Sequence, residues 1–295
     1  MPMQATHRDR TRALLAGALL LGATPALGQT ASPTPPPPAA IVPPGQGMMD
    51  APCPVLRIVL PGARTEPGKP AASGHDAINS YVANQTYTAK YDWAWLCRYQ
   101  PANAAATGAP RPDVVFMGDS ITEFWARYDP GFFGHGIVDR GISGQTSPQM
   151  LLRFFQDVIA LHPRVVHIMA GTNDLAGVGG PTSPEAFENN IRAMVELAQA
   201  EGIRVVLASI PPASAFPWAP KLKPAGQIVA LNAWLKAYAA ERHAVYADYY
   251  TVLVDAADGG MGKAFTADGV HPTTLGYQRM RPIAEQAIAA AERAR

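Results

Sequence analysis

The strongest constraint on the fold is an alternation of short apolar runs with longer amphipathic segments, which begins at Arg111. The runs are rich in β-branched residues and predict strands at 114–117, 136–139, 165–169, 204–208 and 244–247. Strands that alternate with helices indicate a parallel sheet with helices on both faces. We therefore predict a three-layer α/β/α, flavodoxin-like domain with about five parallel strands over residues 111–295.

The segments between the strands have the apolar spacing and the start signals of helices. Ser147-Pro148 and Ser183-Pro184 each supply an N-cap serine followed by a proline of the first turn. The first of these helices has a broad apolar face, formed by Leu151, Leu152, Phe154, Phe155, Val158 and Ile159. Later helices are expected over about 225–242 and from Thr274, and we expect Pro282 to kink or split the last one.

Residues 1–28 have the features of a signal peptide. A basic head, residues 7–12, precedes an apolar run from Ala13 to Leu21, and small residues lead to a cleavage site near Gly28. The run is too short to cross a bilayer, and no cysteine lies at the cleavage region, so neither a stable membrane anchor nor a lipoprotein is expected. The sequence predicts a protein exported to the periplasm or secreted.

The net charge gives no support for nucleic-acid binding. The full chain carries +1, and residues 1–28 contain three arginines and one aspartate, so about −1 remains after cleavage. A near-neutral chain without a basic cluster lacks the electrostatic footprint of a nucleic-acid-binding protein.

Two further segments precede the sheet. Residues 29–50 form a proline-rich linker, and residues 51–110 are interpreted as an N-terminal extension packed on the main domain. The extension holds an aromatic cluster that is either a packing cap or a substrate platform: Tyr87, Tyr91, Trp93, Trp95 and Tyr99.

The chain has two cysteines, Cys53 and Cys97, both upstream of the first strand. An oxidising compartment permits a disulfide between them, which would close a loop of about 45 residues and stabilise the fold by roughly 4 kcal/mol. The alternative is two independent buried thiols.

Small polar turns follow the predicted strands, where ligands bind in parallel α/β sheets. Gly118-Asp119-Ser120 ends the first strand and runs directly into a helix. A serine at that turn can act as a nucleophile beside the free N–H groups of the helix N-terminus, or it can be only the N-cap.

A base for such a serine is available in Asp268-Gly269-Val270-His271. A carboxylate three residues before a histidine can reach Nδ1, which leaves Nε2 free for Ser120. The alternative is an exposed aspartate near an unrelated histidine. His167 lies within a predicted strand and is interpreted as a core residue.

Donors for a developing oxyanion come from two other turns. Gly144 can offer its backbone N–H and Asn173 its side-chain amide, and the Ser120 N–H is the third candidate. Each residue could instead be an ordinary turn or loop-closing residue.

Together these motifs resemble the SGNH, or GDSL-like, hydrolases over about residues 111–290. The matching blocks are residues 118–121, 141–144, 171–174 and 268–271. The resemblance implies Ser120 as nucleophile, His271 as base and Asp268 as its orienting acid. It also implies an oxyanion hole from Ser120, Gly144 and Asn173, and no metal or other cofactor. Arg140 departs from the pattern, because many members carry asparagine there.

We therefore expect an exported serine esterase acting on small, acetyl-type acyl esters, with a small-molecule substrate such as an acylated saccharide or lipid. Phe216 and Trp218, in the proline-rich loop 211–223, either wall the pocket or belong to an ordinary surface loop. Alternatives are a lysophospholipase or thioesterase on longer chains, a carbohydrate O-acetyltransferase and a non-catalytic carbohydrate-binding relative.

Overall fold

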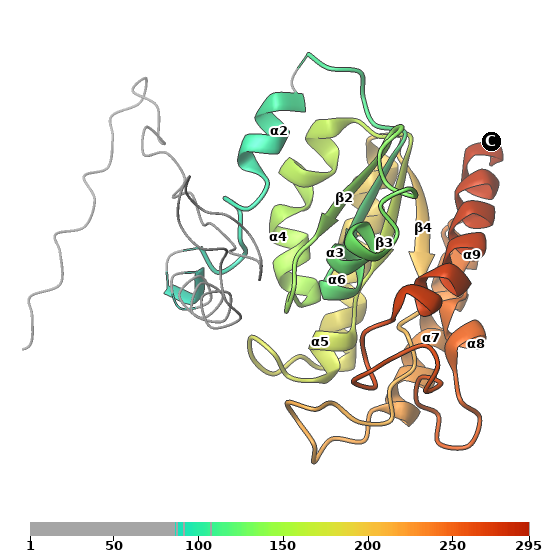
Figure 1. The fold of residues 1–295 in the computed structure, drawn as a ribbon. Helices are drawn as coiled ribbons and strands as arrows, with labels where there is room; N and C mark the ends of the chain where they lie inside the picture. The colour runs from blue at the N-terminus through green and yellow to red at the C-terminus, as the bar shows by residue number, and fades with distance from the viewer. Residues whose placement is uncertain (1–85, 87, 91, 107, 295) are drawn as a thin grey trace, which may run out of the picture. The chain divides into compact units, whose positions relative to one another are not determined.

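The computed structural model describes residues 86, 88–90, 92–106 and 108–294. Their centre is a five-stranded sheet in the order β2-β1-β3-β4-β5, in which every neighbouring pair is parallel (Figure 1). The strands are β1 (Val114–Gly118), β2 (Ile137–Gly141), β3 (Val165–Met169), β4 (Arg204–Ala208) and β5 (Val245–Ala247). This is the flavodoxin-like order, so the predicted fold class is confirmed.

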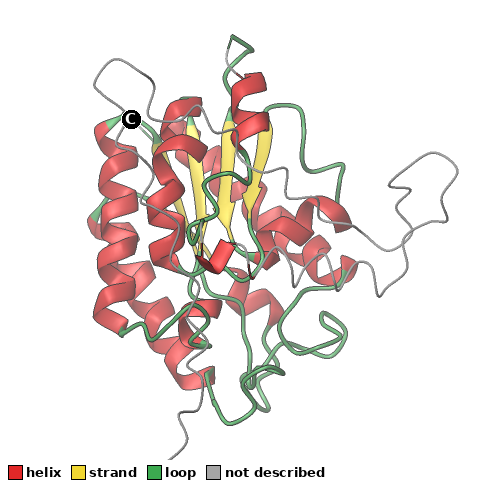
Figure 2. Cartoon of the chain, turned by 90° about the vertical axis from the view of Figure 1, so that its left-hand side faces the viewer, coloured by secondary structure: helices red, strands yellow, loops and turns green. Residues whose placement is uncertain are grey.

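Helices cover both faces of the sheet (Figure 2). One face packs against α4 (Ser147–Asp157), α6 (Pro184–Ala200) and α7 (Ala225–Glu241). The other packs against α3 (Ser120–Tyr128), α8 (Tyr249–Leu253) and α9 (Thr274–Arg293). Of the short helices, α2 (Gln100–Ala106) precedes β1 and α5 (Thr172–Leu175) follows β3. Ala106 and Leu175 pack against the core on the side of α4, α6 and α7.

The strands are buried on both sides, as the apolar runs predicted. In β1, Val115 and Met117 face the layer of α4, while Val114 and Phe116 face the layer of α3. This period of two places each side chain in one of the two cores. The sheet is therefore a rigid base for the loops at its carboxyl edge.

Helix α4 is turned differently from the sequence prediction. Leu152 and Phe155 are exposed at 58% and 67%, whereas Gln149, Arg153 and Asp157 are buried. These three polar residues are four apart, so they share one face of the helix. The predicted broad apolar face was wrong for Leu152 and Phe155, because a buried polar network takes their place.

The helix starts also differ in detail. The N-cap of α4 is Thr146, not Ser147, and its backbone N–H donates to Oε1 of Gln149 at 2.9 Å. The N-cap of α6 is Ser183, as predicted, and its hydroxyl accepts from the Ala186 N–H at 3.0 Å. Helix α9 is not split at Pro282 and continues from Thr274 to Arg293.

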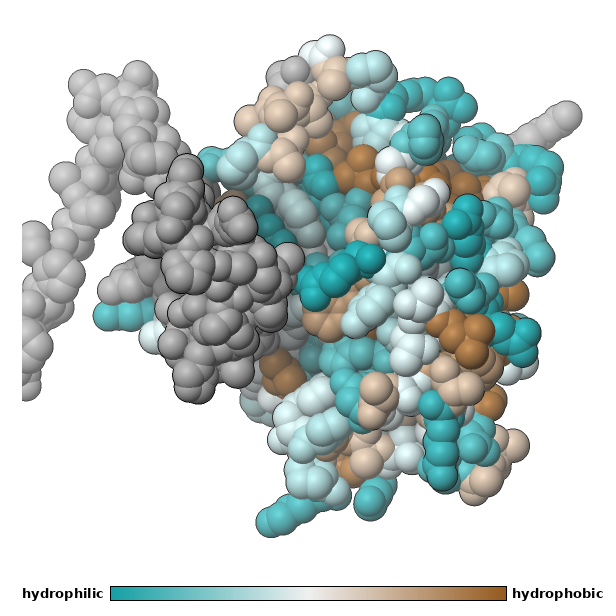
Figure 3. Space-filling view, viewed as in Figure 1, coloured by the Kyte–Doolittle hydropathy of each residue, from teal (hydrophilic) through white to brown (hydrophobic). Residues whose placement is uncertain are grey.

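The surface drawn in Figure 3 mixes hydrophilic and hydrophobic residues. No helix in the described ranges has both the length and the apolar character needed to cross a membrane. The predicted signal peptide, the linker, Tyr87, Tyr91 and Cys53 lie outside the described residues, so the Cys53–Cys97 disulfide stays a prediction.

Candidate active site

Ser120 lies where β1 passes into α3. The N-cap of this helix is Asp119, whose Oδ1 accepts from the Ile121 N–H at 2.9 Å, so the N-cap interpretation of Ser120 is wrong by one residue. Ser120 is the first helical residue, and its N–H therefore has no acceptor within the helix. Gly118 is required before this turn, because a Cβ there would lie 2.0 Å from Oγ1 of Thr122.

The structure brings the predicted nucleophile, base and acid together. Oγ of Ser120 lies 2.9 Å from Nε2 of His271, and Nδ1 of His271 lies 2.7 Å from Oδ2 of Asp268. The carboxylate contact favours the tautomer with the proton on Nδ1, which leaves Nε2 as an acceptor for the serine hydroxyl. The arrangement can take a proton from Ser120 and stabilise the imidazolium that results.

Asp268 is held in its ionised form. Partial burial raises its pKa, but bonds from the His271 ring and from the backbone N–H groups of His271 and Val270 outweigh burial and hold the pKa below its usual value. A carboxylate that keeps its charge can orient and stabilise the base across the neutral pH range.

The three candidate oxyanion donors come from the ends of the adjacent strands β2, β1 and β3. Gly144 has φ 81° in a turn closed by the bond from the Gln145 N–H to the Ile142 carbonyl, a geometry that favours glycine. Its N–H has no acceptor in the part of the chain that the structure describes. It can therefore donate to a ligand.

Asn173 is buried in α5, and its amide is oriented by neighbours. Nδ2 donates to the Gln145 carbonyl at 3.0 Å and makes a longer contact of 3.4 Å with Oδ2 of Asp119. Burial raises the pKa of Asp119 to about 6, although the hydrogen bond from the Ile121 N–H and the nearby His271 both lower it. Asp119 thus caps helix α3, which begins at Ser120, and contacts the candidate oxyanion donor Asn173. The sequence motif alone did not reveal this double role.

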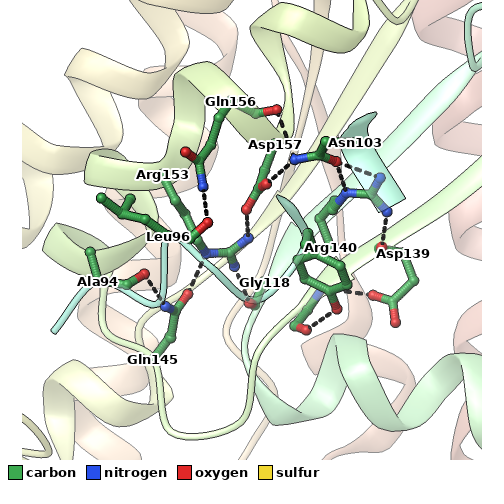
Figure 4. A network of polar contacts seen from close by, with 12 residues as sticks. Ala94, Leu96, Asn103, Gly118, Asp139, Arg140, Gln145, Arg153, Gln156 and Asp157 are labelled. Atoms are coloured by element: carbon green, nitrogen blue, oxygen red, sulfur yellow. Dashed lines mark hydrogen bonds and ion pairs between the residues drawn. The ribbon is translucent and has the colours of Figure 1, made fainter. Parts of the chain in front are cut away.

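A buried guanidinium connects these turns (Figure 4). Arg153, fully buried on α4, donates to Oε1 of Gln145 at 2.5 Å, to Asp157 at 3.0 Å and to the Gly118 carbonyl at 3.1 Å. It therefore ties the end of β1, which precedes Ser120, to the turn that carries Gly144. Sequence reasoning missed this residue, although polar side chains spaced four apart in an apolar helix are a usable signal.

Arg140, the departure from the family pattern, contacts the N-terminal extension. Its Nε and Nη2 atoms donate to Oδ1 of Asn103 at 3.1 and 2.8 Å, and its guanidinium lies 4.7 Å from the ring centre of Tyr99 (Figure 4). The Tyr99 hydroxyl in turn donates to the Gly141 carbonyl at 2.5 Å. Arg140 therefore holds the extension beside the second strand.

Aromatic side chains flank the base. Trp218 is 45% exposed, and its ring centre lies 6.0 Å from that of His271, while Phe216 is buried and stacked against Trp218. Phe124, which sequence reasoning missed, lies 5.3 Å from the His271 ring. Of the two predicted wall residues, only Trp218 is exposed beside the base.

The histidine of β3 differs from His271, whose side chain is partly exposed. His167 is fully buried, its Nε2 lies 2.9 Å from the Tyr249 hydroxyl, and burial lowers its pKa to about 3. It lies in the core, as predicted. Among the described residues, no group of three or more His, Cys, Asp or Glu side chains could hold a metal ion.

Comparisons with known proteins point to one family. The family model of the GDSL-like lipases and acylhydrolases matches residues 116–279. A candidate acylhydrolase from Bacteroides fragilis is 45% identical, with a TM-score of 0.66 over 69% of this chain and 100% of that chain. A GDSL-like lipase from Bacteroides thetaiotaomicron is 43% identical, with a TM-score of 0.65 over 68% of this chain and 100% of that one.

Two further matches have lower sequence identity or cover less of the chain. An acetyl-xylooligosaccharide esterase from Geobacillus is 21% identical with a TM-score of 0.50, over 59% of this chain and 93% of that chain, which shows the fold alone. The uncharacterised lipoprotein YqeF of Bacillus subtilis is 37% identical over 79 residues, or 26% of this chain. That match spans about a third of the curated relative, 32% of its length.

Proposed function

Because this chain belongs to the GDSL-like lipase/acylhydrolase family, whose members are hydrolases acting on esters, we propose that it is a serine esterase for small acyl esters. The observation that carries the proposal is the unbroken contact from Ser120 through His271 to Asp268, at 2.9 and 2.7 Å. These are hydrogen-bond distances, and the order of the groups is the one that serine nucleophiles need.

In the proposed reaction, Oγ of Ser120 attacks the ester carbonyl carbon while Nε2 of His271 takes the hydroxyl proton. The tetrahedral oxyanion is bound by the N–H groups of Ser120 and Gly144 and by the amide of Asn173, whose long 3.4 Å contact with Asp119 is exchanged for the oxyanion. The carbon–oxygen bond to the alcohol then breaks, and His271 returns the proton to the leaving oxygen. Water, deprotonated by His271, attacks the acyl-enzyme and releases the acid with Ser120 restored.

We further propose that the protein is exported by a signal peptide over residues 1–28 and acts in the periplasm or outside the cell. The basic head, the short apolar run and the small residues at the cleavage region support this proposal. In that organisation, residues 29–50 are a linker, residues 51–110 an extension and residues 111–295 the hydrolase domain. The substrate is a small-molecule ester, and an acylated saccharide is one candidate.

A second candidate function, hydrolysis of longer acyl chains, is favoured by a specific cavity. About 340 Å³ lies beside Asp174, next in sequence to Asn173, and its apolar lining includes Leu175, Phe187, Leu222 and Leu231. Apolar walls of this kind can bury methylene groups, at about 0.8 kcal/mol for each. A lysophospholipase or thioesterase would use such a cavity.

Acyl chain length separates the two candidates. We expect kcat/KM to be highest for acetyl esters in a p-nitrophenyl ester series from acetyl to dodecanoyl, measured at fixed ionic strength. A maximum at octanoyl or longer would contradict the small-acyl proposal and favour the lipolytic one. A replacement of Leu231 by Phe, which narrows the apolar cavity, should lower only the rates for the longer esters.

A further inference from the structure

A second cavity, of about 270 Å³, lies beside the turn that carries Gly144. Its walls come from four parts of the chain: the N-terminal extension with Trp93 and Trp95, the turn with Ser143 and Gly144, helix α4 with Gln149, and the loop after α5 with Val178 and Gly179. Trp93, Trp95, Val178 and Gly179 have no assigned role in the proposed reaction. The cavity is therefore a candidate subsite next to the reacting centre.

The extension is held in place by hydrogen bonds to its main-chain carbonyls, which leaves the exposed indole of Trp93 available for a ligand. The side-chain amides of Gln149, Gln145 and Gln156 donate to the carbonyls of Trp93, Ala94 and Leu96, at 2.7, 2.9 and 2.5 Å (Figure 4 shows the last two). Gln145 and Gln149 also line the cavity. The two tryptophans are thus set on a backbone fixed to the same elements as the oxyanion turn.

The conformation of the tryptophans supports a role beyond packing. Trp93 is 40% exposed at the cavity, which is unusual for an indole that serves only the core. Trp95 has φ 57°, a left-handed conformation that is uncommon for a bulky residue and is found at functional sites more often than elsewhere. Trp95 itself is buried at 7% exposure, so it lines the cavity from the protein side.

The cavity has both aromatic and polar lining residues, which limits the kind of ligand that it can bind. The Ser143 hydroxyl donates to Glu123 at 2.5 Å, so its oxygen can still accept a hydrogen bond from a ligand, whereas the Gly144 N–H is assigned to the oxyanion. An alkyl chain here would cover the Ser143 oxygen without satisfying it. A sugar ring presents an apolar C–H face to an indole and hydroxyl groups to the polar side, so it satisfies both.

We propose that this cavity binds one sugar ring of an O-acylated saccharide, with Trp93 and Trp95 as its aromatic wall. This inference rests on the proposed esterase function and names the class of substrate. It also assigns a role to the segment before residue 116, where the family match begins. The extension then contributes specificity, while the motifs after it contribute the chemistry.

The test compares two acetyl esters that differ in the presence of a sugar. We would measure kcat/KM of the full-length protein on an O-acetylated methyl xyloside and on p-nitrophenyl acetate. For Trp93→Ala, the ratio of the saccharide value to the p-nitrophenyl value should fall at least tenfold, through a higher KM for the saccharide. Trp95→Phe, which keeps an aromatic ring, should lower the ratio less. Leu152→Ala, on the exposed side of α4, is the matched control, and its ratio should stay within twofold.

Each result decides one claim. An unchanged ratio in both tryptophan variants, with an active wild type, would overturn the sugar subsite and leave the esterase proposal standing. A selective loss on octanoyl esters would overturn it as well, because the cavity would then bind the acyl chain. A wild-type protein without activity on either acetyl ester would overturn the esterase proposal and this inference with it. A Tm for Trp93→Ala within a few degrees of the wild type excludes misfolding as the cause of a lower ratio.

Discussion

Replacing Ser120 with alanine should lower kcat on p-nitrophenyl acetate by about 10⁴-fold or more, with little change in Tm. The hydroxyl forms the bond to the acyl carbon in the proposed reaction, so no other group can replace it. Ser120 is buried at 8% exposure, and alanine removes only one oxygen from the helix start. Helix α3 keeps its N-cap, because that role belongs to Asp119.

The same size of loss is expected for His271→Ala, and the double variant should be little worse than either single one. Groups that act as one unit in a reaction are strongly non-additive when they are removed together. His135→Asn is the matched control, because His135 is an exposed loop residue with φ 47° that asparagine tolerates. Losses that add up, or a Ser120→Ala variant with most of its activity, would contradict the assigned roles.

The second large effect concerns stability. Arg153→Met should lower the free energy of unfolding by about 3–5 kcal/mol, the usual result of removing one partner of a buried ion pair. Neither charge of the Arg153–Asp157 pair has any solvent exposure. Among the described residues, the substitution leaves the amide of Asn103, at 2.6 Å, as the one hydrogen-bond donor to the Asp157 carboxylate, and it removes the donor to the Gly118 carbonyl.

Denaturant unfolding of three variants tests this account. The double variant Arg153→Met/Asp157→Leu should recover part of the loss, because it also removes the unpaired charge. Arg281→Met is the control: its guanidinium is 40% exposed beside Asp129 and Glu285, and such pairs are worth about 1 kcal/mol or less. Equal losses of unfolding free energy for Arg153→Met and Arg281→Met would show that the buried network stabilises the fold no more than an exposed ion pair does.

Much of the fold could be predicted because it depends on local patterns. The apolar runs 165–169 and 204–208 became β3 and β4 with the same bounds. Parallel strands bring their carboxyl ends to one edge, so turns far apart in sequence could be predicted to meet. For this reason Ser120 and His271 could be paired from the sequence.

The parts that could not be predicted depend on contacts between distant segments. The inward turn of Arg153 follows from partners at Gly118, Gln145 and Asp157, and no periodicity of α4 encodes the first two. Because Arg153 takes the buried face of α4, Phe155 is turned toward solvent. Likewise, the cavity beside Gly144 requires Trp93, which is about 50 residues away in sequence and follows no repeated pattern.

The central claim, that Ser120 is a nucleophile activated by His271, is tested most directly by covalent labelling. Folded protein treated with a fluorophosphonate and digested should give one modified peptide, with the adduct on Ser120 identified by mass spectrometry. Labelling should be lost in Ser120→Ala, strongly slowed in His271→Ala and absent after denaturation of the wild type. An unlabelled Ser120 in the folded protein, or an adduct on another serine with Ser120 free, would contradict the account.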